Sequence, residues 1–241
     1  MVAPERVMVS YLRAITSHHG PGLGPVPLQG CARELGLDGL ALLLGPGGNP
    51  PELVQSFGEH TAALEDLQRV QGQGPSLDAA EYGLLMLLPK VSDPTAFAPT
   101  RWPGLPVAIE EMGVGAVFAF PLRIGVIALG ALTGHRNRPG SLSPDQLADA
   151  FTLADTLAQA IIAQAAGMDG PEARLLDEPG LHFAEVHQAT GMLSAQLNIS
   201  CAQALIRLRS HAFSHNLSLL TTARDVLSHR LRLDNPDSPW P

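Results

Sequence analysis

The chain has 241 residues, enough for one large domain or two small ones. Hydrophobic residues make up 45% of it, which supports a packed core and excludes wholesale disorder. No apolar run approaches the roughly 20 residues that a bilayer-spanning helix needs, and no basic stretch leads into an apolar run near the start. With only two cysteines as well, we expect no membrane segment, no secretory signal and a reducing, cytoplasmic setting.

The net charge of −8 is unevenly distributed along the chain. Residues 181–233 hold five arginines against Glu185 and Asp225, a net charge of +3, whereas residues 1–180 sum to −9. Such an asymmetry indicates nucleic-acid contact in the basic part. An ordinary solvated helix surface would show the same charges, so both interpretations stay open at this point.

Residues 1–166 show short alternating elements. Helices are expected near 11–18, 29–35 and 60–70, and strands near 40–44, 53–57, 84–88, 116–122 and 124–132. The last two strands flank a tight break at Arg123-Ile124-Gly125, which favours an antiparallel hairpin. This order predicts an α+β domain in which helices pack on a mostly antiparallel sheet.

A long helix is expected after Ser143, where Pro144 and Gln146 complete a capping box. Two apolar stripes follow at helical spacing, Leu147, Ala150, Ala154, Leu157 and Ile161 in one, and Phe151, Ala158 and Ile162 in the other. One stripe could face the sheet and the other a second copy of the chain. A single broad core face would give the same pattern.

Residues 167–180 are rich in glycine and proline and are expected to form a linker. Residues 181–233 then predict three helices, at 182–197, after Ser200 (with Gln203, a second capping box) and after Ser218. Their apolar faces are small, so this bundle has a thin core that docking of the linker or of a partner chain would support. Residues 234–241 form a tail rich in proline and aspartate.

The helical segment resembles the ANTAR domain. The resemblance rests on an ordered pattern, A-x-G-x-L from Ala189 to Leu193, an alanine at Ala204 after an eleven-residue gap, and L-R-x-x-A from Leu208 to Ala212. It implies a three-helix RNA-binding module that acts in transcription antitermination and binds RNA hairpins as a dimer. Thr190 stands where many members have lysine, which removes one cation from a phosphate-binding surface.

If the resemblance holds, RNA contacts come from arginine, histidine and amide side chains, because aromatic residues are scarce here. We expect these contacts from Gln188, Thr190, Arg207, Arg209, His211, His215, Asn216 and Arg224.

Residues 1–166 are more weakly similar to a GAF sensor domain of the kind fused to ANTAR modules in actinobacterial antitermination regulators. The similarity lies in Arg101–Gly104, Phe118–Arg123, Gly130–Leu132 and Pro139–Ser143. It implies a sensory and dimerisation domain with an unknown small-molecule ligand. Trp102, Phe118 and Phe120 are the candidate pocket residues, although Trp102 would equally fill the core.

No arrangement of catalytic residues is visible, so we expect no enzyme activity, no metal and no cofactor. Gly45-Pro46-Gly47-Gly48 lacks a following Lys-Ser/Thr and is expected to be a turn. His18 and His19 have no nearby partner for a metal, and Cys31 is expected to be a buried structural thiol. The alternative to an RNA-binding regulator is a ligand-binding or protein-interaction module whose helical C-terminus only mediates dimerisation.

Overall fold

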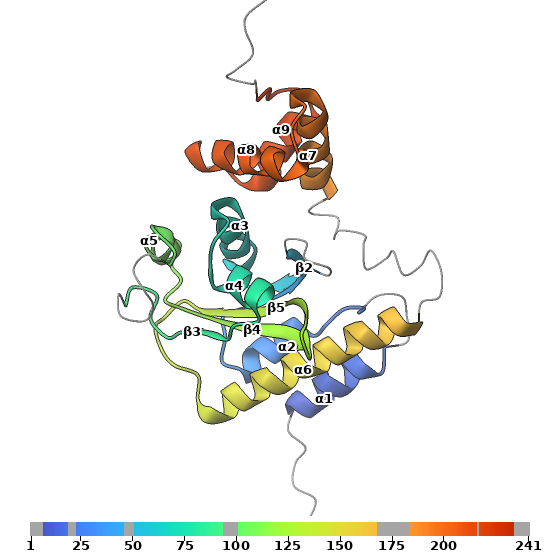
Figure 1. The fold of residues 1–241 in the computed structure, drawn as a ribbon. Helices are drawn as coiled ribbons and strands as arrows, with labels where there is room; N and C mark the ends of the chain where they lie inside the picture. The colour runs from blue at the N-terminus through green and yellow to red at the C-terminus, as the bar shows by residue number, and fades with distance from the viewer. Residues whose placement is uncertain are drawn as a thin grey trace, which may run out of the picture.

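The computed structural model describes residues 7–18, 23–45, 51–93, 101–167, 184–215 and 217–233. Its first part is a five-stranded antiparallel sheet between two layers of helices (Figure 1). The strands are β1 (Gly39–Leu44), β2 (Glu52–Phe57), β3 (Met86–Leu88), β4 (Ala116–Ile124) and β5 (Ile127–Arg136), in the order β2-β1-β5-β4-β3. The predicted α+β class with an antiparallel sheet is confirmed.

The β4–β5 hairpin turns later than predicted. Ile124 ends β4 and pairs with Ile127, so the turn residues are Gly125, at φ +59°, and Val126. Pro121 sits inside β4 because β3 pairs only with residues up to Ala119, so the missing N–H falls where β4 has no neighbour on that side.

One face of the sheet is covered by α1 (Val7–Thr16), α2 (Leu28–Glu34) and α6 (Pro144–Gly167). The capping box of α6 is present, since Ser143 and Gln146 exchange hydrogen bonds of 2.9 and 3.2 Å. The two predicted stripes of α6 are not separate faces. Ala158 joins the first stripe in one broad core face, while Phe151 and Ile162 stay partly exposed, at 40% and 36%.

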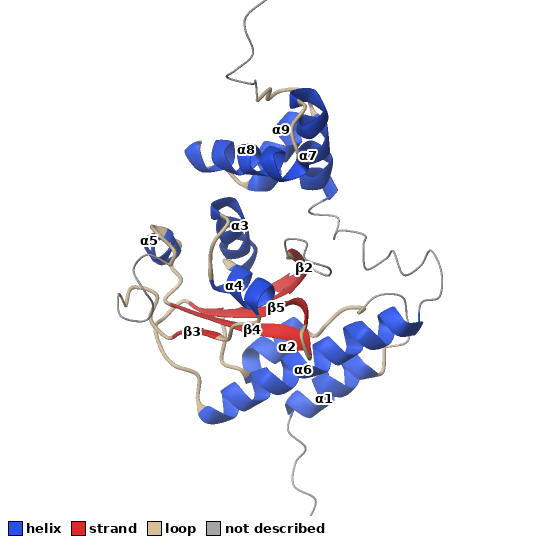
Figure 2. Ribbon diagram, viewed as in Figure 1, coloured by secondary structure: helices blue, strands red, loops and turns tan. Residues whose placement is uncertain are grey.

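The other face carries α3 (Thr61–Gln71), α4 (Pro75–Tyr82) and α5 (Leu105–Glu111) (Figure 2). Helix α4 was not predicted, because its buried residues are small and it is only eight residues long. Pro75 at its start and Gly83 at its left-handed C-cap are the signals that mark it. It covers the small residues Ala119 and Ala131 of the sheet.

The C-terminal part consists of three packed helices, α7 (Ala184–Leu197), α8 (Cys201–Ser214) and α9 (Leu219–Leu227). Both predicted caps are present, with Ser200 in a reciprocal capping box with Gln203 and Ser218 accepting from the Thr221 N–H. The predicted linker beyond Gly167, the tail and Asn216 lie outside the described residues.

The core of the bundle continues into the first domain. Ala41, Leu43, Leu53 and Val70 belong to the same buried cluster as the inward residues of α7, α8 and α9. The bundle thus rests on the side of the sheet that carries α3, opposite α1 and α6 (Figure 1). The support expected from the linker or from a partner chain is supplied, in the part that the structure describes, by α3 and the β1–β2 edge.

The described part of the chain holds neither a helix that could span a membrane nor a cluster of metal ligands. None of its helices has the length and hydropathy needed to cross a membrane. Within the same residues, no three His, Cys, Asp or Glu side chains gather as metal ligands would.

Candidate nucleic-acid interface

The pattern shared with the ANTAR domain consists mainly of core residues. Ala189, Leu193, Ala204, Leu208 and Ala212 are fully buried in the bundle. Their spacing is what three short helices need in order to pack closely. The pattern therefore indicates the bundle fold, and an RNA surface has to be argued from the exposed residues between these positions.

Gly191 is the one residue of the pattern whose identity packing does not explain. It lies in the middle of α7, is exposed, and a Cβ placed on it would meet no atom within 4 Å. A glycine inside a helix costs about 1 kcal/mol relative to alanine. Gly191 was not among the residues predicted to contact RNA, although a mid-helix glycine without a packing role lets a partner approach the backbone closely.

Gln188 lies on α7, and Arg224 lies on the neighbouring helix α9. Gln188 is exposed and shares a helix face with Glu185 and Gly191, each three residues away. The Arg224 Nε donates to Glu185 Oε2 at 2.8 Å, which ties α9 to α7. These four residues, of which Glu185 is half-buried and the other three are exposed, are called the α7–α9 seam below.

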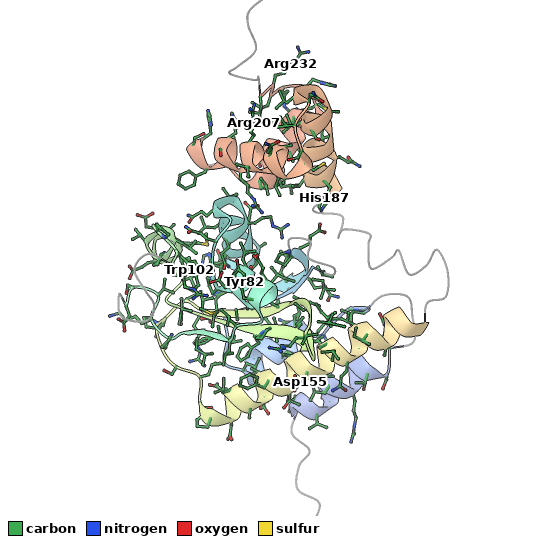
Figure 3. All side chains as sticks on the ribbon, in the orientation of Figure 1. Tyr82, Trp102, Asp155, His187, Arg207 and Arg232 are labelled. Carbon is green, nitrogen blue, oxygen red and sulfur yellow. The ribbon has the colours of Figure 1, made fainter. Side chains whose placement is uncertain are left out.

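Arg207, His211 and His215 form a second group along α8, at four-residue spacing. The two imidazole rings stack, with centroids 3.9 Å apart. Burial and the neighbouring His215 lower the pKa of His211, which favours an uncharged ring there. Figure 3 shows Arg207 on the helix α8 and Arg232 at the far end of the bundle from the sheet.

Thr190 and Arg209 are not on the exposed surface. Thr190 is only 7% exposed and its hydroxyl donates to the Val186 carbonyl within α7, at 2.7 Å. Arg209 points to the end of α3, where a Cβ on Gly72 would lie 3.4 Å from its Nη1. A cation is favoured at this negative end of the α3 dipole, although burial lowers the pKa of Arg209. In this arrangement Thr190 is buried and Arg209 is half-buried.

Polar contacts also hold the bundle on the first domain. His187 at the start of α7 pairs with Glu52 of β2, and this carboxylate raises the pKa of His187. Figure 3 shows His187 on the side of the bundle that faces the sheet. Asp66 of α3 accepts a hydrogen bond from the Leu219 N–H, at 3.3 Å, at the start of α9. Asp66 of α3 therefore complements a helix N-terminus of the bundle, and Glu52 of β2 complements a basic side chain.

Both acidic residues of the bundle are engaged with its own arginines. Glu185 pairs with Arg224, and Asp225 accepts from Arg230 at 2.7 Å. The other arginines of residues 181–233, Arg207, Arg209 and Arg232, give this segment its net charge of +3.

The three candidate pocket residues of the first domain do not meet. Phe118 and Phe120 point from β4 into the core beneath α6, and Phe120 packs edge-on against Phe151. Trp102 is buried on the opposite face of the sheet, with α3 and α5, and its Nε1–H donates to Asp78 Oδ2 at 3.0 Å. The three residues therefore do not line one cavity in this structure, because Phe118 and Phe120 face the α6 side of the sheet and Trp102 lies on the α3 side.

A buried polar network fills the space between α3, α4 and the sheet instead. Ser76 of α4 is its centre and donates to Glu65 Oε1 at 3.1 Å while it accepts from Gln68 at 2.8 Å and Thr133 at 3.0 Å. Desolvation raises the pKa of Glu65 to about 7, so this carboxyl is largely protonated in mildly acidic solution.

His135 adds a second buried ionisable group nearby. The Thr61 hydroxyl donates to the Phe57 carbonyl, so the proton between Thr61 and His135 sits on the histidine Nε2. Burial lowers the pKa of His135 to about 4, and the ring is neutral.

The two cysteine thiols differ in their exposure to solvent. Cys31 is fully buried, and this burial raises its pKa to about 12, which makes it inert. Cys201 is exposed at the start of α8.

The first domain aligns with solved GAF domains. The GAF domain of an Acinetobacter phosphoenolpyruvate-protein phosphotransferase aligns at 15% identity over 68% of this chain and 95% of that chain, with a TM-score of 0.51. The GAF domain of a Coxiella burnetii phosphoenolpyruvate-protein phosphotransferase aligns at 19% identity over 67% and 95%, with a TM-score of 0.49. No protein-family model and no curated protein matches the sequence.

The first domain has a GAF-like fold. The region of the GAF-like domain between sheet and helices is occupied by the Glu65–Ser76 network and by α4, whose alanines pack on Ala119 and Ala131. Two open spaces among the described residues lie on the outer side of α3, where the bundle docks.

Proposed function

We propose that this chain is an RNA-binding transcriptional regulator of the antitermination type, in which the GAF-like domain senses a signal and mediates dimerisation for an ANTAR-like module formed by α7, α8 and α9. The observation that carries the proposal is Gly191, an exposed mid-helix glycine one turn from Gln188, on which no atom of the described residues packs. A helix that gives up stability at such a place gains close approach to a ligand backbone.

RNA recognition of this kind combines phosphate contacts with stacking and hydrogen bonds to unpaired bases. Arg207 and Arg232 supply charge, and the amide of Gln188 supplies base-edge hydrogen bonding at the α7–α9 seam. The stacked rings of His211 and His215 offer a flat surface for a base. In the docked arrangement we assign the contacts to these residues and Arg224, and not to the buried Thr190 or the half-buried Arg209.

The test is the binding of the full chain to a two-hairpin leader RNA and to a scrambled RNA, over a series of salt concentrations. Three phosphate contacts per module predict a slope of log K against log salt of about −2 to −3. We expect Arg207→Ala to make this slope less steep by about 1, because one contact is lost.

Arg138→Ala is the matched control, since Arg138 is an exposed arginine of the first domain. It should leave both affinity and slope unchanged. Equal affinity for the two-hairpin and the scrambled RNA would contradict the proposal, as would equal effects of the two substitutions.

A second function is favoured by the docking itself. The bundle buries Leu43, Leu53 and Val70 of the GAF-like domain, so it would also serve as a purely structural or dimerising element. Under this alternative Arg207→Ala and Gly191→Ala leave every RNA affinity unchanged, and substitutions at the docked face alter the oligomeric state instead.

A further inference from the structure

A groove of about 490 Å³ lies between the two domains, bounded by α3 and α5 on one side and by the adjoining ends of α8 and α9 on the other. This volume is within the usual range of small-molecule sites, which occur preferentially at domain interfaces. Most of the lining is apolar, with Leu53, Ala62, Ala63, Leu67, Val70, Ala108, Ala212, Phe213, Leu217 and Leu220.

Small residues on one wall and exposed large residues on the other keep the groove open. Ala62 and Ala63 face it from α3 and leave room that larger side chains would fill. Phe213 and Leu217 border it from the bundle and remain 64% and 37% exposed. Large apolar groups gathered at the edge of a cavity are a typical feature of ligand sites.

Asp66 is the single charged residue among those that line the groove. The polar side chains of Ser218 and Gln71 are already used, by the Thr221 N–H at 2.9 Å and by Gln73 at 3.0 Å. Asp66 accepts the Leu219 N–H, and a carboxylate has about four acceptor positions, so it retains capacity for a further donor. Burial raises the pKa of Asp66, whereas the Leu219 N–H and the charge of Arg69, buried on the same helix, favour the charged carboxylate. Arg69 does not line the groove.

We propose that this groove binds a small apolar amine, whose hydrocarbon body packs between Leu67, Phe213 and Leu217 and whose ammonium group pairs with Asp66. The site lies outside α3 and is distinct from the space between the sheet and its helices. Because its walls come from both domains, a bound amine contacts both at once. The proposal does not depend on RNA binding.

The experiment is calorimetric titration of the full chain with three probes that share one naphthalene skeleton, namely 1-naphthylmethylamine, 1-naphthalenemethanol and 1-naphthoic acid. We expect the amine to bind about tenfold more tightly than the alcohol, because a hydrogen bond to a charged group exceeds a neutral one. The acid should bind most weakly. Asp66→Asn keeps an acceptor for the Leu219 N–H and should bring the amine to the affinity of the alcohol.

Two further variants locate the site. Ala63→Trp fills the groove from an exposed position and should abolish binding of all three probes, whereas Ala148→Trp, an exposed alanine of α6 beyond the sheet, should not. Leu217→Lys, at the exposed rim, should weaken the amine more than the alcohol. Absence of binding by every probe at millimolar concentration would overturn the proposal, as would binding of the amine that Ala63→Trp and Asp66→Asn both leave unchanged.

Discussion

Gly191 shows how a single position separates stability from function. It is exposed in the middle of α7, and no neighbouring atom would obstruct a side chain there. Residues at such places are normally chosen for helix propensity, which makes glycine the costliest ordinary choice. This loss of helix stability is compensated only if a molecule outside the described residues binds close to the backbone at Gly191.

We therefore predict that Gly191→Ala stabilises the protein by about 0.5–1 kcal/mol in chemical unfolding. The same change should weaken binding to the two-hairpin RNA by about tenfold, since the methyl group prevents close approach. Gln196→Ala, at another exposed position of α7, is the control and should leave RNA affinity unchanged. If the Gly191→Ala variant is stabilised but keeps full RNA affinity, Gly191 is not part of the RNA interface.

Thr190 and Arg209 illustrate the opposite case. Their residue types suggest contact with RNA at the surface, but their positions in the fold limit their exposure. The Thr190 hydroxyl satisfies a carbonyl of its own helix, and Arg209 lies at the C-terminal end of α3. Local spacing places Arg209 next to exposed residues of α8. Only the packing of α8 on α3 reveals that it is half-buried.

Helix α3 is the element on which the two halves of the molecule meet. Its inner face carries Glu65 and Gln68 into the polar network, and its outer face carries Asp66 and Val70 toward the bundle. A sequence reading of this helix finds only Leu64 and Leu67 at apolar spacing. The buried Glu65, Gln68 and Arg69 are not predictable as core residues, because polar side chains are buried only when distant partners satisfy them.

The network predicts two opposing contributions to stability as the pH changes. Glu65 has its pKa raised from 4.5 to about 7 in the folded state, so its contribution is present below pH 4.5 and is lost as the pH rises toward 7. His135 has its pKa lowered from 6.5 to about 4, so its contribution is lost as the pH falls from 6.5 toward 4. Each amounts to at most about 3 kcal/mol, and between pH 4.5 and 6.5 they largely cancel.

Glu65→Gln removes one of the two contributions. We measure the free energy of unfolding in urea and compare the variant with the wild type. We predict that the difference, variant minus wild type, increases by up to about 3 kcal/mol as the pH rises from 4.5 to 7. Glu110→Gln, an exposed change on α5, should show no such trend. A difference between Glu65→Gln and wild type that does not vary with pH would contradict the raised pKa.

At the scale of the whole molecule, the bundle and the GAF-like domain share one apolar cluster. The nine buried side chains of α7, α8 and α9 make a thin core for an independent domain of this size, and the docked face adds Ala41, Leu43, Leu53 and Val70. We therefore expect the docked face to contribute directly to the stability of the bundle.

Val70→Ala tests this coupling. Removal of two methyl groups from a buried valine costs about 1–3 kcal/mol, and we predict that α8 and α9 lose hydrogen-exchange protection. Val114→Ala is the matched control, because Val114 is equally buried in the cluster beside Trp102. If the two substitutions lower protection of the bundle to the same extent, the two domains do not communicate through the α3 face.

Local patterns in the sequence determined the helices and strands, both helix caps of the bundle and the spacing of its core. Ser143 with Gln146 and Ser200 with Gln203 are signals contained within four residues, and the alanine and leucine positions of α7 and α8 follow from helical periodicity. The strand order and the short helix α4 were harder to predict from the sequence. In α4 this is because small buried residues such as Ala79 produce no strong hydrophobic pattern.

The tertiary structure decided which of the candidate residues face solvent. It placed Trp102 and Phe118 on opposite faces of the sheet, buried Thr190, half-buried Arg209, left Gly191 open and created the groove beside Asp66. Burial depends on contacts between segments far apart in the chain, and neither composition nor spacing contains that information. The chemistry of the proposed RNA surface could thus be anticipated from residue types, whereas the exposure of its residues on α8 depends on how α8 packs on α3.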